Sequence, residues 1–562
     1  MRRFRAVWLS MALLAVGELV GGAQETANPS SGSATAAAVP GPNSAPGSFD
    51  EVVDRMVERE RQLVAQMRNL RPMVETYVQE SKTDKAGNLI PMRDQYSLER
   101  LDLSQGPQGV SFLAQGSIGG SLGKLGGIFS QRLRPQDFAA MVVLDPDFYR
   151  KYYDFTYVRR EFLGEVRCIV IDAEPKADAP AGRFQGRIWV EDQDYNVVRF
   201  NGSYVQSSLH FDSWRLNLRP GMWLPAYVYS EESGQDRGSG QFHLKAQTRL
   251  WGFDRKNAAQ NRNDEFTQIV VDSQIQDQSG TAADATPLAA ERLWEKQAED
   301  NVVERLQKVA LLAPAGGVDK VLQAVVNNLI ISNNLALQSD VRCRVLITAP
   351  LESFTISHTI VLSRGLLDVL PDEASLAMIL AHELSHIVLG HRFDAKLAFN
   401  DRMFFPDEQS FQRLDFKRRP ADEAAADAKA LELLKNSPYQ EKLASAGLFL
   451  RALQQHAPEL PNLIRPHLGN SFAVGAITRM STLLAAAPPL DAQRIDQIAA
   501  LPLGGRIKLD PWSDQVELAK VQPVALALAR EKMPFEITPF FPHLTRQAAE
   551  HGEKIASAGS GN

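Results

Sequence analysis

Cysteine is scarce in this 562-residue sequence, since only Cys168 and Cys343 are present. Two cysteines cannot build a disulfide framework, and their spacing matches no thiolate metal site and no CxxC redox motif. A metal would therefore have to be held by histidine and carboxylate. Both cysteines lie in apolar, strand-like surroundings, where we expect two buried thiols rather than a bridge.

The sequence also lacks a basic excess and a long apolar run. Its 61 Lys and Arg residues stand against 67 Asp and Glu residues, a net charge of -6, which disfavours general nucleic-acid binding. No run of about 18 or more apolar residues is present, so we expect no transmembrane span in the mature chain. Hydrophobic residues make up 44% and charged residues 23%, values typical of a folded protein of about two to four domains.

The first residues have the order of a secretory signal. Three arginines lie within residues 1–5, an apolar stretch interrupted only by Ser10 covers residues 6–17, and small residues follow at 21–23. A membrane anchor is the alternative, but the stretch is too short to span a bilayer and Glu18 interrupts it. We predict a cleaved signal peptide over residues 1–23 and a periplasmic or secreted protein.

The rest of the chain divides by composition into an α+β, multidomain protein. Residues 49–78 repeat apolar side chains at helical spacing, and short β-branched and aromatic runs between about 96 and 271 predict an antiparallel curved sheet, with a hairpin at 184–190 and 195–204. After residue 288 the pattern is helical, interrupted by a strand pair near 341–346 and 354–362. The predicted segments are a disordered linker (24–48), a helix-and-sheet domain (49–280), a second linker (281–297), a mainly helical domain with a small sheet (298–545) and a flexible tail (546–562).

The helical part contains His382-Glu383-Leu384-Ser385-His386, an HExxH motif. Four residues at about 100° each bring the second imidazole only about 40° round from the first, so both rings project from one face of a helix and can bind one Zn²⁺. Glu383 lies beside them, where it can take a proton from water and pass it to a leaving amine. Two core histidines without a metal are the less favoured alternative.

The third metal ligand must come from elsewhere in the chain. The metzincin pattern is excluded, because Leu389 and Arg392 occupy the places of its glycine and third histidine. His391 lies beyond Gly390, which we expect to end the helix, so it should cap or pack rather than ligate. In the segment 419–427, Pro420 and Asp422 begin a second helix, on which Glu423 and Asp427 stand four residues apart.

We predict that Glu423 completes a His₂Glu zinc site, one Zn²⁺ per chain, with an open position for water. Asp427 would accept the second ring N–H of a ligand histidine. Upstream, apolar residues alternate with hydroxyl-bearing ones over 354–362. If this strand is a sheet edge, an extended substrate peptide could pair with it, beside Phe354, Ile356 and His358.

These motifs together resemble the zinc metallopeptidase family that includes the HtpX heat-shock endopeptidases and the CAAX prenyl endopeptidases. The resemblance rests on the strand and turn at 354–367, the helix at 381–391, the ExxAD element at 423–427 and a Pro-x4-Arg-Ile segment at Pro489. It implies a gluzincin fold and endopeptidase activity, with Arg494 as a transition-state or substrate contact. Pro488 occupies the position before Pro489 where the family often has a histidine. Because we expect no spanning helix in the mature chain, it resembles the soluble periplasmic branch of the family.

The N-terminal strands, especially 186–191 and 197–200, resemble in pattern the half-barrel of LolA-like lipoprotein carriers. We therefore predict an exported zinc metalloendopeptidase that hydrolyses unfolded or misassembled envelope or outer-membrane proteins, as in protein quality control. A lipoprotein or lipid carrier or chaperone, with secondary or no protease activity, is the alternative. An inactive metal-bound scaffold is a third reading, because the family histidine is missing.

Overall fold

The computed structural model describes residues 46–83, 89–102, 108–113, 135–144, 148–180, 182–236, 240–253, 297, 300–337, 339–391, 407–474, 477–491, 494, 497, 503–519 and 535–547. The predicted signal peptide and nearly all of the predicted linkers and tail lie outside these residues. Every element below belongs to the compact unit Ser48–Asn562. Within the described ranges, none of the helices combines the length and the apolar character needed to cross a bilayer.

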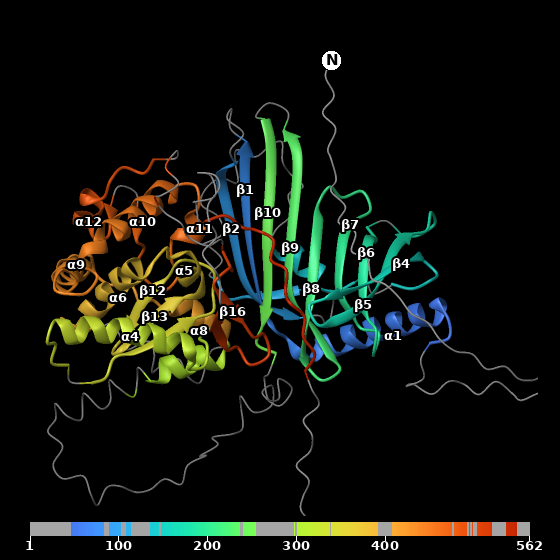
Figure 1. The fold of residues 1–562 in the computed structure, drawn as a ribbon, viewed down its shortest axis with the longest axis horizontal. Helices are drawn as coiled ribbons and strands as arrows, with labels where there is room; N and C mark the ends of the chain where they lie inside the picture. Colours follow the sequence, from blue (N-terminus) through green and yellow to red (C-terminus); the bar gives the residue numbers. More distant parts are fainter. Residues whose placement is uncertain are drawn as a thin grey trace, which may run out of the picture. The chain divides into compact units, whose positions relative to one another are not determined.

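A ten-stranded antiparallel sheet forms the N-terminal part, as the runs of β-branched and aromatic residues predict (Figure 1). Its order is β3-β2-β1-β10-β9-β8-β7-β6-β5-β4, so every neighbouring pair along the chain from β4 to β10 forms a hairpin. The predicted hairpin at 184–204 is confirmed as β6 and β7, which pair through Phe184 and Tyr204. The strands are β1 (Met73–Thr83), β2 (Leu89–Asp102), β3 (Gln108–Ser111), β4 (Tyr153–Leu163), β5 (Val166–Pro175), β6 (Phe184–Glu191), β7 (Val197–Tyr204), β8 (His210–Arg219), β9 (Met222–Asp236) and β10 (Gly240–Trp251).

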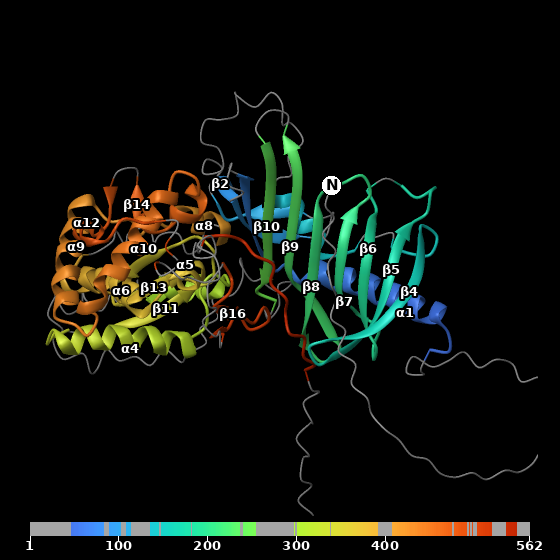
Figure 2. The same ribbon diagram turned by 45° about the horizontal axis from the view of Figure 1, so that its top comes forward.

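Helix α1 (Phe49–Leu70) covers one face of this sheet (Figure 2). The Ser48 hydroxyl accepts from the Glu51 N–H at 3.2 Å, which caps the first turn. The prediction that the helix continues to Val78 is wrong, because the chain enters the left-handed region at Arg71 and β1 begins at Met73. Pro72 explains the end, since a proline disfavours helical conformation in the residue before it. The 3-10 helix η1 (Pro135–Val142) packs on the same face.

The C-terminal part is mainly helical, with a three-stranded sheet of order β11-β13-β12. Sequence alternation predicted one strand over 354–362, and this is wrong. The segment forms a hairpin of β12 and β13, with Ser357 (φ 50°) and His358 in the turn. The strands and helices are β11 (Arg342–Leu346), β12 (Ser353–Ile356), β13 (Thr359–Ser363), α4 (Gly317–Ser332), α5 (Arg364–Val369), α6 (Glu373–Val388), α8 (Asp407–Arg413), α9 (Pro420–Lys435), η2 (Gln440–Lys442), α10 (Leu443–His456), α11 (Pro461–Ile464), α12 (Ser481–Ala486), β14 (Ala473–Val474), β15 (Ile477–Thr478), β16 (Ile507–Leu509) and β17 (Val516–Leu518).

Buried polar contacts join the two parts on the sheet face opposite α1. Glu75 of β1 accepts from the Ala349 N–H at 2.6 Å and from the Arg364 guanidinium at 2.7 Å. Asp94 of β2 accepts from the Leu463 N–H at 2.8 Å. The segment 535–547 then returns across the sheet, where the ring of Phe541 lies 6.2 Å from that of Trp214. The mainly helical part is therefore held to the sheet by side-chain contacts and by its own chain end.

Candidate metal centre

Helix α6 carries the HExxH motif in the interior. Asp372 caps its start by accepting from the Ser375 N–H at 2.8 Å, and Gly390 (φ 66°) follows its last turn, as expected. Only 1–2% of the surface of His382, Glu383 and His386 is exposed. Such polar side chains are costly to bury without partners, so the surroundings of each one matter.

Helix α9 supplies the carboxylates and packs against α6. Pro420 occupies its first turn, where a missing N–H costs nothing, and Glu423 and Asp427 follow one turn apart. Ala426 and Ala430, both fully buried, lie on the packed side of the helix. Their small side chains let the two helices approach closely enough for the α9 carboxylates to reach the imidazoles of α6.

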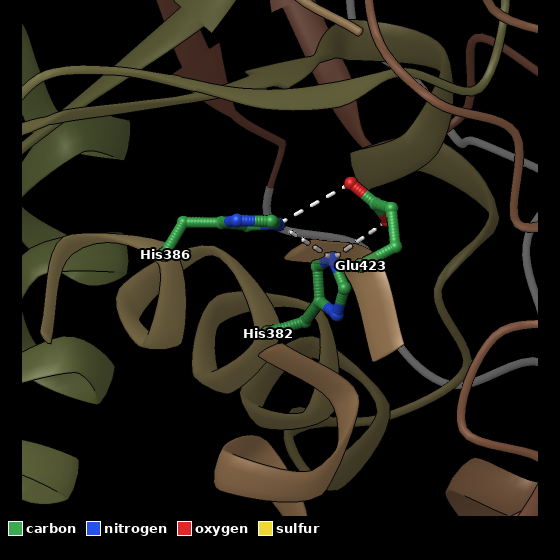
Figure 3. A group of neighbouring side chains, drawn as sticks. All are labelled: His382, His386 and Glu423. Atoms are coloured by element: carbon green, nitrogen blue, oxygen red, sulfur yellow. Dashed lines mark hydrogen bonds and ion pairs between the residues drawn. The ribbon is translucent and has the colours of Figure 1, made fainter. Parts of the chain in front are cut away.

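His382, His386 and Glu423 converge on one point (Figure 3). The two Nε2 atoms are 3.1 Å apart, and the Glu423 oxygens lie 3.3 Å from His382 Nε2 and 3.4 Å from His386 Nε2. Tetrahedral zinc with ligand bonds of about 2.0–2.2 Å would place neighbouring ligand atoms about 3.3–3.6 Å apart. The three side chains therefore fit a zinc ion in both donor type and spacing.

Asp427 holds the outer nitrogen of His382. Its Oδ1 lies 2.8 Å from His382 Nδ1, and its Oδ2 accepts from the Met480 N–H at 2.8 Å. A carboxylate beside Nδ1 favours the ring proton on that nitrogen, so Nε2 is the nitrogen that would lose its proton and bind a metal. On His386, the outer nitrogen lies 3.0 Å from His391 Nδ1, so His391 packs behind the cluster rather than joining it.

Glu383 is held by two hydroxyls of β12. Ser353 donates to its Oε1 at 2.6 Å and Thr355 donates to its Oε2 at 2.7 Å. The hydroxyl-bearing side of the strand thus faces the motif. Phe354 instead stacks on Phe416, with ring centroids 4.7 Å apart.

Of the other two residues predicted to lie beside a substrate, Ile356 belongs to β12 and His358 does not. Ile356 is buried at the end of β12, and His358 lies in the turn beside the Ser357 hydroxyl. β12 is an edge strand of its sheet, and Arg418 donates to its Thr355 carbonyl at 3.0 Å. The edge position of β12 agrees with the sequence expectation, whereas His358 lies beyond the strand.

The cluster sets the charge of its members. Burial acts to raise the pKa of Glu383, but the imidazoles of His382 and His386 bring it below its ordinary value. For Glu423, burial is likewise outweighed by bonds from both imidazoles, and the pKa is far below normal. Burial and the Arg479 charge act to lower the pKa of His382, but its bonds to Asp427 and Glu423 raise it to about 8. Both glutamates are therefore anionic at neutral pH.

Arg479 is the cluster residue that sequence reasoning missed. Its Nε lies 3.0 Å from Glu423 Oε2 and its Nη1 lies 3.7 Å from Glu383 Oε1. No motif surrounds it, and only the contact of the β14–β15 hairpin with the cluster reveals it. Arg494, the sequence candidate for a substrate contact, is exposed, and its N–H donates to the Asp491 carbonyl at 3.2 Å.

Solved structures provide one set of comparisons, for the N-terminal region. They include a LolA superfamily protein from Nitrosomonas europaea (13% identity, 36% of this chain and 92% of that one, TM-score 0.17) and a DUF1329 family protein from Desulfovibrio piger (13%, 35% and 93%, TM-score 0.19). The complex of MucA and MucB from Pseudomonas aeruginosa also matches (10%, 36% and 93%, TM-score 0.13). No curated protein sequence is significantly similar to this chain.

Residues 318–405 match the profile of Peptidase family M48. The match begins in α4 and includes all of α6, but it ends before α9. Glu423 and Asp427 are therefore placed beside the histidines by the structure alone. Over the segment that carries both histidines, the chain is similar to the M48 metallopeptidases.

Proposed function

We propose that the chain is an exported zinc metalloendopeptidase. The observation that carries this proposal is the convergence of His382, His386 and Glu423 at ligand spacing. The Glu383 carboxylate lies on the same helix as the two histidines. The assigned roles are His382, His386 and Glu423 as ligands of one Zn²⁺ and Glu383 as general base. The M48 match supports peptide-bond hydrolysis as the reaction class.

A zinc ion at this site would supply the Lewis acidity that makes a water molecule nucleophilic near neutral pH. Glu383 takes the proton from the attacking water and later gives it to the leaving amine. Ser353 and Thr355 hold its two oxygens by hydroxyl donation, which keeps the carboxylate charged and fixed in direction. Asp427 fixes the tautomer of His382 so that Nε2 is available as a ligand.

The substrate would be an extended polypeptide paired with the β12 edge, a recognition mode that edge strands allow. All four residues of β12 are buried, so this pairing would require the segment that covers the edge to move. The Arg418 guanidinium that bonds to the Thr355 carbonyl occupies an acceptor that such a peptide would use. An unfolded or misassembled envelope protein could offer the required extended segment, whereas a folded protein pairs its strands internally. This choice of client rests on the predicted signal peptide.

A carrier role for the sheet is less well supported by the described contacts. One apolar face packs on α1 and η1, and the other packs on the mainly helical part and on the segment 535–547. Apolar side chains that already contact their own chain have less surface for an acyl chain. We therefore propose that the sheet supports the peptidase part.

The test measures zinc content and casein cleavage of the purified mature chain, with and without a chelator. We expect about one zinc per chain, cleavage that stops with the chelator, and recovery on adding zinc. Glu383→Gln should keep the metal and lower cleavage at least about 100-fold. Glu373→Gln, on an exposed turn of the same helix, is the matched control and should retain activity. A metal-free wild type, or a fully active Glu383→Gln, would overturn the proposal.

A further inference from the structure

The hairpin of β14 and β15 presents one arginine to the cluster. The Arg479 N–H donates to the Phe472 carbonyl at 3.0 Å and closes the hairpin, and the guanidinium lies 4.9 Å from the Phe472 ring centroid. Nη2 donates to the Asn470 carbonyl at 2.6 Å, and the residue is 9% exposed. Two contacts of the guanidinium therefore immobilise a side chain that is normally flexible, which is costly unless its direction matters.

The guanidinium spans carboxylates from two helices. Nε is 3.0 Å from Glu423 Oε2, and Nη1 is 3.7 Å from Glu383 Oε1. Neither nitrogen makes a well-aligned hydrogen bond among the described residues, so both contacts are mainly electrostatic. The next residue acts on the same helix α9, because the Met480 N–H donates to Asp427 at 2.8 Å. The hairpin thus contacts both α9 carboxylates of the site.

A charge count shows what this arginine contributes. Glu383, Glu423 and Asp427 carry three negative charges in a largely buried cluster. A divalent cation would leave a net charge of -1, and the guanidinium brings it to zero. An uncompensated buried charge is strongly unfavourable, so the balance requires both the metal and the arginine.

We propose that Arg479 is a positioning residue of the metal centre, which holds Glu423 Oε2 so that Glu423 is fixed as a ligand and which neutralises the charge that a divalent cation leaves. This inference rests on the proposed function and deepens it. The role differs from that of Arg494, which the resemblance suggests as a transition-state or substrate contact.

The experiment measures zinc affinity by competition with a chromophoric chelator, a readout that does not depend on activity, together with kcat and KM for a peptide substrate. Arg479→Gln should weaken zinc binding by about 10–100-fold, as expected for a group that orients a ligand. Arg479→Lys keeps the charge and loses the planar fork, so its loss should be smaller. Arg451→Gln is the matched control, since that guanidinium bonds to the Leu484 and Ala487 carbonyls instead.

The outcomes separate this inference from the proposed function. Wild-type zinc affinity in Arg479→Gln, while the wild type cleaves peptides, would overturn the positioning role and leave the peptidase intact. Equal losses in Arg479→Lys and Arg479→Gln would overturn the charge balance. A larger loss of zinc affinity in Arg494→Gln than in Arg479→Gln would assign the positioning role to Arg494 instead. A wild type that binds no zinc would overturn both proposals.

Discussion

Buried charges are arranged differently in the sheet and in the metal centre. In the sheet, Glu60 of α1 bonds to Arg215 of β8 at 2.6 and 2.8 Å, and both side chains are at most 4% exposed. On the opposite face, Arg199 bonds to Asp212 at 2.8 and 2.9 Å. Each acid in these pairs has one guanidinium, bound through two nitrogens.

The metal centre gathers three carboxylates, and in the part of the chain that the structure describes two of them, Glu423 and Glu383, face the Arg479 guanidinium, whereas Asp427 contacts His382. Balanced pairs fix how elements pack, whereas an excess of buried acid with facing imidazoles favours a bound cation. The same residue types therefore serve structure in one region and chemistry in the other. Substitutions in the two regions should consequently change different measured quantities.

The largest expected effects come from removing one charge in each region. Glu60→Gln breaks a buried pair and should lower the free energy of unfolding by about 3–5 kcal/mol, with zinc affinity unchanged. Glu423→Gln should weaken zinc binding more than about 100-fold, because it removes the carboxylate ligand. It should also lower the stability of the metal-free protein, since the imidazoles and Arg479 favour the charged carboxylate. Chemical denaturation and chelator competition measure the two quantities, and an equal loss of zinc affinity in both variants would contradict the distinction.

A smaller effect is expected at Asp427. Asp427→Asn keeps the size of the side chain and the acceptor for the Met480 N–H, but it removes the charge beside His382 Nδ1. Zinc affinity should fall about 10–100-fold, the usual cost of losing such a partner. Glu432→Gln, at an exposed position of α9, is the control and should bind zinc normally. An unchanged affinity in Asp427→Asn would show that the tautomer of His382 is fixed by other means.

The smallest expected effect is at Glu352, a buried acid that belongs neither to the salt-bridged pairs of the sheet nor to the metal centre. Its Oε1 accepts from the His467 N–H at 2.6 Å, and burial raises its pKa to about 7. An unfolded glutamate ionises near pH 4.3, so the unfolded state loses its proton first as pH rises. The contribution of protonated Glu352 to the free energy of unfolding is therefore complete below about pH 4, and it is lost as the pH approaches and passes 7.

Glu352→Gln removes this titration and keeps the acceptor. The variant should match the wild type in melting temperature near pH 4 and exceed it by a few degrees at pH 8. Thermal unfolding across that range is the measurement, and a difference independent of pH would contradict the assignment of the raised pKa.

Part of the fold could be predicted because it depends on local patterns. Runs of β-branched and aromatic residues between turn clusters identified the antiparallel sheet, helical spacing identified α1, and the HExxH motif identified α6. The errors lie where one residue interrupts a pattern. Pro72 ends α1 before Val78, and Ser357 turns an alternating segment into the β12–β13 hairpin. Periodicity describes which faces are apolar, but it does not show where the chain reverses.

The sequence by itself determined that His382 and His386 share one helix face, with Glu383 beside them, because helix geometry relates residues four apart whatever surrounds them. It also placed Glu423 and Asp427 one turn apart on a second helix. Only the tertiary structure decided that these helices meet, that Ser353 and Thr355 hold Glu383, and that Arg479 reaches the cluster. Those contacts join segments far apart in the chain, and their distances depend on how the intervening core packs rather than on any local pattern.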